Sequence, residues 1–254
     1  MTDLVDCHAH LADEVFDVDR EQVLERARLA GVRRVVAVGE TLADAERNLD
    51  LARKHEAILP AAGLYPTYLD LDACEKLERL IRARHGELVA IGEVGLDHWK
   101  VKEPEQREIQ REILLRQIRL AGELDLPLNI HSRSAGRHVV ALLLEQGASR
   151  VQLHAFDGKP ATALPAVEAG YYFSIPPSVV RSRQKQKLVK RLPLSCLLLE
   201  TDSPVLSAVP GERNEPSEVR VALSAIAELK GLTEDEVAEA VTANSYRLYG
   251  TALQ

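Results

Sequence analysis

The chain has 254 residues, of which 46% are hydrophobic and 28% are charged, and its formal net charge is −7. This length suits one large α/β domain, since an eightfold α/β barrel takes about 250 residues, and the apolar content excludes a disordered chain. The negative net charge excludes a protein that binds nucleic acid through a globally basic surface. It does not exclude a local basic patch. No apolar run reaches the roughly 18–20 residues of a membrane span.

Short apolar runs that are typical of buried strands alternate with amphipathic stretches along the whole chain. Apolar residues recur at helical spacing over residues 21–30 and 105–124, for example. The strand-like runs are residues 3–7, 34–38, 58–63, 87–92, 127–131, 150–154, 171–175 and 195–200. Eight β/α units in this order predict a distorted (β/α)8 TIM barrel that occupies residues 1–254 as a single domain.

The rival architecture is an open, doubly wound sheet. Its dinucleotide-binding form would carry a G-x-G-x-x-G motif at the first helix, and this sequence has none there. Residues 203–216, with three prolines, predict a long loop after the eighth strand. Thr233 followed by Glu236 forms a capping box, which predicts an extra C-terminal helix over residues 234–249 that packs across the barrel.

The cysteines indicate a reducing environment. Cys7, Cys74 and Cys196 form no C-x-x-C pair, and Cys7 and Cys196 fall in predicted strands, where we expect buried free thiols. An odd and sparse cysteine count, with no signal peptide before the first predicted strand, favours a cytoplasmic protein. No long exposed apolar stripe stands out, which favours a monomer.

Histidines and carboxylates occur where the predicted strands end. His8 and His10 lie two residues apart, so they share one face of the first strand. A lone histidine at a strand end is ordinarily a hydrogen-bonded side chain, but here six candidates end five separate runs. They are His8, His10, Glu93, His131, His154 and Asp202. Because the carboxyl ends of barrel strands converge on one face, we expect all six to meet in one cup.

Six ligands are too many for one zinc-like catalytic ion, which usually takes about three and keeps one position open. They suit two divalent ions about 3.5–4 Å apart. Glu93 is the natural bridge, because a carboxylate offers two oxygens and an imidazole one lone pair. The first-strand histidines with Asp202 would hold one ion, and His131 with His154 the other. The nitrogen-rich set favours zinc, manganese or iron, and magnesium remains open.

Taken together, these motifs make the chain resemble the TatD-type metal-dependent hydrolases of the amidohydrolase superfamily from end to end. The motifs are Asp-Cys-His-Ala-His-Leu, Gly-Glu-Val-Gly-Leu-Asp, Ile-His-Ser-Arg, Leu-His-Ala-Phe-Asp-Gly, Glu-Thr-Asp-Ser-Pro, and Arg-Asn-Glu-Pro at 213–216. The resemblance implies a dinuclear site that Glu93 bridges, and a catalytic Asp202 that ligates metal and handles the water proton. It also implies a deoxyribonuclease, of exonuclease type, that acts on DNA. Other branches of the superfamily bridge their metals with a modified lysine at the fourth strand. The corresponding run of this chain has Glu93 and no lysine, which favours the TatD branch.

The chain departs from the family after the third predicted strand. Members commonly show Gly-x-His-Pro there, whereas this sequence has Tyr65 at the histidine position. A tyrosine can donate a hydrogen bond to phosphate, but with an ordinary pKa of about 10 it stays protonated near neutral pH and cannot transfer a proton as a histidine can. The departure points to a different substrate or to a slower nuclease.

A phosphoester substrate also needs cations beyond the metals. Arg133 and Lys159 follow the fifth and sixth predicted strands, and the planar fork of Arg133 suits a phosphate. The basic segment 181–191 could contact a nucleic-acid backbone or form an ordinary solvated helix. Weaker candidates for substrate contact are Arg137, Arg213, His98 and His138, and Trp99 could stack on a base.

Two other functions use the same residues. The metal pair could hydrolyse another ester, a phosphate monoester or an amide. A non-catalytic metal-binding protein is the third alternative, but a structural site would not need two clustered sets of ligands.

Overall fold

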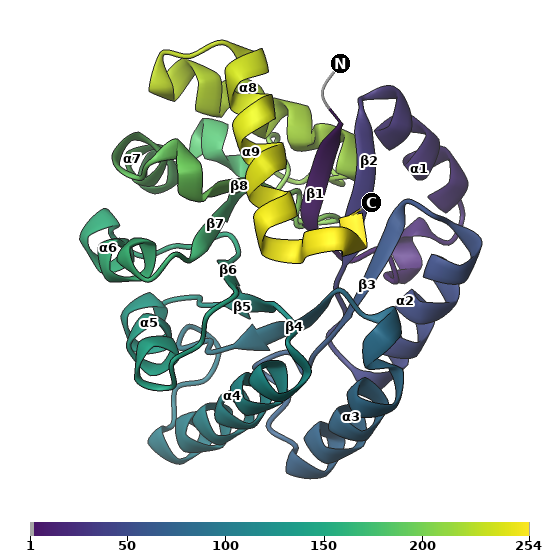
Figure 1. Ribbon diagram of the computed structural model, residues 1–254, viewed down its shortest axis with the longest axis vertical. Helices are drawn as coiled ribbons and strands as arrows, with labels where there is room; N and C mark the ends of the chain where they lie inside the picture. Colours follow the sequence, from purple (N-terminus) through teal and green to yellow (C-terminus); the bar gives the residue numbers. More distant parts are fainter. Residues whose placement is uncertain (1–2, 254) are drawn as a thin grey trace.

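The computed structural model describes residues 3–253, which form a barrel of eight parallel strands in sequence order, each beside its successor (Figure 1). The strands are β1 (Leu4–Ala9), β2 (Val32–Ala37), β3 (Ile58–Ala62), β4 (Ala90–Gly95), β5 (Leu128–His131), β6 (Val151–Leu153), β7 (Tyr172–Ile175) and β8 (Leu197–Leu199). Each falls within or overlaps one of the eight apolar runs, so the predicted barrel is confirmed and the open sheet is excluded.

Helices surround the barrel, and each of α1 to α8 follows the strand of the same number, while α9 follows α8 (Figure 1). The α-helices are α1 (Arg20–Leu29), α2 (Leu42–Lys54), α3 (Leu71–Arg84), α4 (Pro104–Leu124), α5 (Gly136–Glu145), α6 (Pro160–Glu168), α7 (Arg183–Arg191), α8 (Val219–Lys230) and α9 (Glu234–Tyr249). Short 3-10 helices are η1 (Glu14–Phe16), η2 (His85–Glu87), η3 (Pro177–Arg181), η4 (Leu194–Cys196), η5 (Pro216–Glu218) and η6 (Gly250–Leu253). None of the described helices is long and apolar enough to cross a membrane.

The core lies between the strands and the helices. Leu77 and Ile81 of α3, Leu114 of α4 and Leu143 of α5 are fully buried against the sheet. Each such side chain contributes about 1.5–3 kcal/mol relative to an exposed one, so the ring of helices holds the strand ends in fixed positions. Cys7, Cys74 and Cys196 are buried free thiols, as the sequence predicts for the two that lie in or beside strands.

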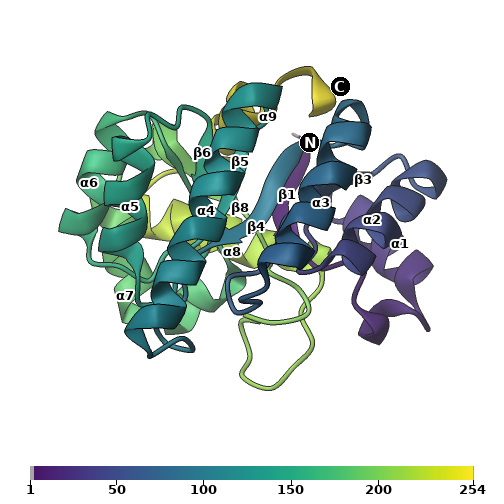
Figure 2. The ribbon, with the colours of Figure 1, turned by 90° about the horizontal axis from the view of Figure 1, so that it is seen from below.

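The predicted C-terminal helix closes one end of the barrel. Its capping box forms between Thr233 and Glu236. Asn244 donates to the carbonyls of Leu194 and Leu197 where β8 begins, and the Tyr249 hydroxyl donates to Gln152 Oε1 in the barrel interior. α9 therefore covers the amino-terminal ends of the strands. Figure 2 shows α9 at one end of the molecule and the loop that follows β8 at the other.

The joint between the first and last strands is held differently from the rest of the sheet. In the described residues the sheet runs from β1 to β8 without a regular ladder between those two strands. Instead, Asp202 N donates to His8 O and His10 N donates to Ser203 O, both at 2.8 Å. The Asp6 carboxylate also accepts from the Thr201 amide and hydroxyl, at 2.9 and 2.6 Å. The hydrogen bonds that connect the first strand to the end of the last strand therefore involve His8, His10 and Asp202, which are candidate site residues.

Candidate metal centre

Six side chains from five strands meet at the carboxyl end of the barrel. His8 and His10 come from β1, Glu93 from β4 and His131 from β5, while His154 and Asp202 directly follow β6 and β8. Three groups of donors lie within 4.8 Å of one another. They are His8 with His154 and Asp202, His8 with His10 and Glu93, and Glu93 with His131 and His154. The groups overlap, so the six residues form one cluster.

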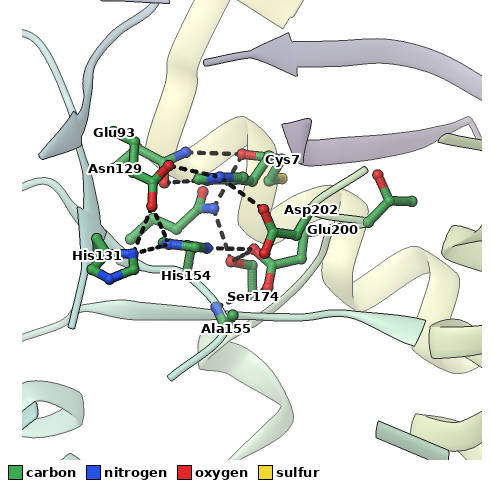
Figure 3. Close-up of polar contacts among 12 residues, drawn as sticks. Cys7, Glu93, Asn129, His131, His154, Ala155, Ser174, Glu200 and Asp202 are labelled. Carbon is green, nitrogen blue, oxygen red and sulfur yellow. Dashed lines mark hydrogen bonds and ion pairs between the residues drawn. The ribbon is translucent and has the colours of Figure 1, made fainter. Parts of the chain in front are cut away.

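Glu93 lies at the centre of the cluster, and its two oxygens face different histidines (Figure 3). Its Oε1 lies 2.6 Å from His131 Nδ1 and 2.9 Å from His154 Nε2. Its Oε2 lies 3.4 Å from His10 Nε2 and 3.7 Å from His8 Nε2. A carboxylate placed in this way can bind two cations at once.

A glycine allows β4 to approach β5 closely enough for this contact. Gly95 has φ +153°, and a Cβ atom built on it would lie 1.9 Å from the carbonyl oxygen of His131. Only glycine fits such a close approach of two backbones. The Gly-Glu-Val-Gly motif therefore brings Glu93 beside the histidine of the next strand.

Asp202 completes the cluster on the β1 side. Its Oδ1 lies 3.4 Å from the Nε2 atoms of both His8 and His10. Asp202 itself has φ +56°, a left-handed backbone conformation that directs its side chain off the end of β8. The two histidines of β1 thus face one carboxylate oxygen from β8 and one from β4.

A second layer of polar side chains orients the imidazoles. Asn129 donates through its Nδ2 to the Cys7 carbonyl, so its Oδ1 accepts from His8 Nδ1 at 2.8 Å and leaves Nε2 directed into the cluster. His131 Nε2 lies 3.1 Å from Asp97 Oδ2, which leaves its Nδ1 directed at Glu93. Metal-binding histidines are typically held through their other ring nitrogen in this way.

Two buried polar atoms of the cluster have no hydrogen-bond partner among the described residues. Glu93 Oε2 and His154 Nδ1 are buried and make no hydrogen bond. A buried carboxylate oxygen without a donor is costly, and a bound cation removes that cost. The donor set, four imidazoles and two carboxylates, also matches what zinc, manganese or iron prefer. The residues therefore fit a divalent metal ion.

The electrostatics favour a cation as well. Burial favours the neutral carboxyl of Glu93, but His154 and His131 outweigh it and hold the pKa of Glu93 well below its usual range. The histidines of β1 likewise lower the pKa of Asp202 against the effect of burial. The pKa of His8 rises to about 10 despite burial, because Asp202 and Glu93 stabilise its charged form. A cation that binds must displace such protons, so binding weakens at low pH.

A cavity of about 460 Å³ opens above the cluster. Tyr65 lines it, with its ring 5.1 Å from that of His131, and burial raises the pKa of Tyr65 so that the phenol stays protonated. Arg133 also lines it and stacks on Trp99, with its guanidinium carbon 3.9 Å from the ring centroid. Lys159, at the residue before α6, is not among the lining residues.

The other residues singled out from the sequence for substrate contact are not among those that line this cavity. Arg213 is paired with Asp19, at 2.6 Å. His98, His138 and Arg137 line a neighbouring hollow, where the two imidazole centroids are 5.0 Å apart.

Sequence reasoning did not identify several residues of the site. Asn129 and Asp97 hold the imidazoles, and Glu40, Asp157 and Lys185 line the cavity. A signal existed for Asn129, since it is a polar residue inside an apolar run and shares a face with His131 two positions on. The other roles depend on contacts between distant segments.

Comparison with known proteins places the chain in a family. The profile described as TatD related DNase matches residues 5–250. The chain is 46% identical to human deoxyribonuclease TATDN3, over 97% of this chain and 94% of the human protein. It is 38% identical to the Bacillus subtilis metal-dependent hydrolase YabD, over 97% of this chain and 98% of that protein. The crystal structure of the TatD homologue YjjV from Escherichia coli matches with a TM-score of 0.90 and 30% identity, over 98% of this chain and 99% of that one. The chain therefore belongs to the TatD-related DNase family and is a hydrolase of that family.

Proposed function

We propose that this protein hydrolyses phosphodiester bonds of DNA with two divalent ions that share Glu93. The observation that carries the proposal is the position of Glu93, whose two oxygens face separate pairs of histidines. His8 and His10 with Asp202 would hold one ion, and His131 with His154 the other. The name of the human relative, a deoxyribonuclease, supports DNA as the substrate.

The residues divide the chemistry between them. Divalent ions in such a site lower the pKa of bound water and offset charge on the phosphoryl oxygens. Asp202 accepts the proton of the attacking water on its carboxylate, which lines the cavity and is ionised because its pKa is low. Tyr65 cannot share this task, because its phenol stays protonated and only donates a hydrogen bond.

The substrate backbone meets cations around the cavity. The guanidinium carbon of Arg133 lies 3.9 Å from the centroid of the Trp99 ring, and this contact would restrict the side chain that offers its planar N–H fork to a phosphate. Lys159, at the start of α6, would contact a longer strand beyond the cavity. A cavity of about 460 Å³ suits the end of a strand rather than an intact duplex, which supports exonuclease action.

A second candidate function is hydrolysis of another ester, a phosphate monoester or an amide. The observation that favours it is Tyr65, which replaces the histidine that family members commonly carry. Oligodeoxynucleotides labelled at either end, a generic phosphate monoester and a carboxyl ester, each tested with magnesium, manganese and zinc, separate the two functions. Shortening of the oligonucleotide from one end supports the proposal, and turnover of the carboxyl ester alone contradicts it.

Asp202→Asn tests the proton-handling role directly. We expect kcat on the oligonucleotide to fall by about 10²–10⁴-fold, because a positioned base contributes that much, while KM changes little. Glu212→Gln, in the exposed part of the loop after β8, is the control for an acidic side chain outside the cavity. An Asp202→Asn variant with normal kcat would rule out this role.

A further inference from the structure

Lys185 differs from the rest of the basic segment to which it belongs. It lies in the first turn of α7, where the Ser182 hydroxyl accepts from its amide at 3.3 Å and caps the helix. Its neighbours Arg183 and Lys187 are exposed, but Lys185 is only 9% exposed and lines the cavity above the metal cluster. One cation of the segment is therefore directed inward.

The ammonium group of Lys185 is only partly satisfied by the protein. It has three donors, and one of them reaches the Ala155 carbonyl at 2.7 Å. Within residues 3–253, no carboxylate lies within ion-pair distance of its Nζ. Burial lowers the pKa of Lys185, although Glu200, Asp202 and Asp157 oppose this by their charge. A buried cation without an ion pair is costly, and an anion in the cavity would remove that cost.

Apart from the proposed metal ions and the imidazoles of the cluster, the cavity offers a substrate few positive charges. Among its lining residues, Arg133 is the one other lysine or arginine, and it enters from the loop after β5. Four carboxylates line the same cavity, namely Glu40, Glu93, Asp157 and Asp202. Asp157 lies in the loop after β6, and its charge would repel a phosphate on that side of the cavity if Lys185 were neutral.

We propose that Lys185 binds a non-bridging phosphate oxygen of the substrate strand and so determines the preference for a charged phosphodiester over a neutral ester. This inference rests on the proposed phosphodiesterase function. Arg133 and Lys185 enter the cavity from different elements, so a strand held by both would be fixed at two points along its backbone. Two such points favour a polymer over a small ester.

A purely structural role is the alternative. Gln184 Nε2 donates to the Gly158 carbonyl at 2.5 Å, and Lys185 donates to the Ala155 carbonyl, so both tie α7 to the loop after β6. If Lys185 served only this purpose, its loss would act like the loss of Gln184. The two residues therefore make a matched pair for an experiment.

The experiment compares Lys185→Met and Lys185→Arg with the controls Gln184→Ala and Lys187→Met in metal-loaded protein. The substrates are a single-stranded oligodeoxynucleotide and the same strand with one neutral methylphosphonate next to the linkage that is cut. We expect Lys185→Met to raise KM by about 10–100-fold, since a hydrogen bond to a charged group is worth that much. Lys185→Arg should keep most of the affinity, and both controls should keep KM.

The methylphosphonate separates phosphate binding from packing. In the protein without substitutions, the methylphosphonate should raise KM by a factor similar to the one that Lys185→Met causes with the natural strand. In Lys185→Met the methylphosphonate should raise KM little further, because the contact with the phosphate is already lost. Metal content should stay unchanged in Lys185→Met. Its melting temperature should fall no more than that of Gln184→Ala. If Lys185→Met does not fold, Lys185→Gln replaces it.

Two outcomes overturn the inference. An unchanged KM in Lys185→Met, or an equal methylphosphonate penalty with and without Lys185, contradicts phosphate binding while the proposed function stands. Failure of the unmodified protein to cut any oligonucleotide contradicts the proposed function, and this inference with it.

Discussion

The two ends of the barrel treat their buried polar groups in opposite ways. At the closed end, Tyr249 donates to Gln152, and Gln152 donates in turn to Ser174 and to the Cys7 carbonyl. At the open end, one buried oxygen of Glu93 makes no hydrogen bond, and two carboxylates lie among four imidazoles. Both ends are built on the same eight strands.

The difference distinguishes an end whose polar groups are paired within the protein from an end whose polar groups are suited to binding. A polar network in which donors and acceptors are paired makes a packed end rigid. Charged groups crowded together in a buried site, with a polar atom that makes no hydrogen bond, are costly in the free protein, and such costs are typical of functional sites. The contrast predicts that substitutions at the open end change function more than stability, and that those at the closed end do the reverse.

Glu93→Ala is expected to have the largest effect. If Glu93 bridges two ions as proposed, its removal would take a ligand from each of them. The loss of metal affinity should then exceed the factor of about 10–100 that follows from losing a residue that only orients a ligand. Metal content measured after gel filtration, together with oligonucleotide hydrolysis, checks this. Asp125→Ala, an exposed acidic residue at the end of α4, is the control. Full metal content in Glu93→Ala would refute the bridging role.

Removal of metal by a chelator should have the next largest effect, on stability. An ion at 100 times its Kd stabilises the folded state by about 2.7 kcal/mol, which corresponds to roughly 5–10 °C in Tm for a chain of this size. Thermal melts with and without chelator measure the shift. Glu93→Ala should show almost none of it, and an unchanged Tm in the unmodified protein would mean that no ion is bound under those conditions.

Tyr249→Phe tests the closed end and should have the smallest effect. It leaves the buried Gln152 Oε1 without its donor, which costs about 1–3 kcal/mol in the free energy of unfolding. Chemical denaturation measures this loss. Metal content and kcat should stay within twofold, because α9 lies at the far end of the barrel. A variant that loses its metal but keeps its stability would show that the two ends are coupled.

Most of the fold could be predicted from the sequence because barrel strands buried on both faces are continuous apolar runs. The eight runs and the capping box at Thr233 depend only on local sequence. The cluster followed from the same pattern, since every candidate ligand ends a strand and barrel geometry brings those ends together.

Contacts between distant segments were harder to predict. The segment 181–191 reads as a solvated basic helix, yet Lys185 shares its buried face with Leu188 and Val189. The 3.6-residue period places these three together, but the strong charge of the segment hides that pattern. Asp97 is the last residue of the Gly-Glu-Val-Gly-Leu-Asp motif, but its partner His131 lies on the next strand, and no local signal pairs the two.

The joint between β1 and β8 gives a bound ion a second consequence. An ion held by His8, His10 and Asp202 would connect the first strand to the last, at the one place where the described sheet lacks a regular ladder. It would form a cross-link there between the beginning of the chain and its final quarter. Exchange of the His10 and Asp202 amide protons with solvent should then slow when the ion binds, before any other part of the barrel responds.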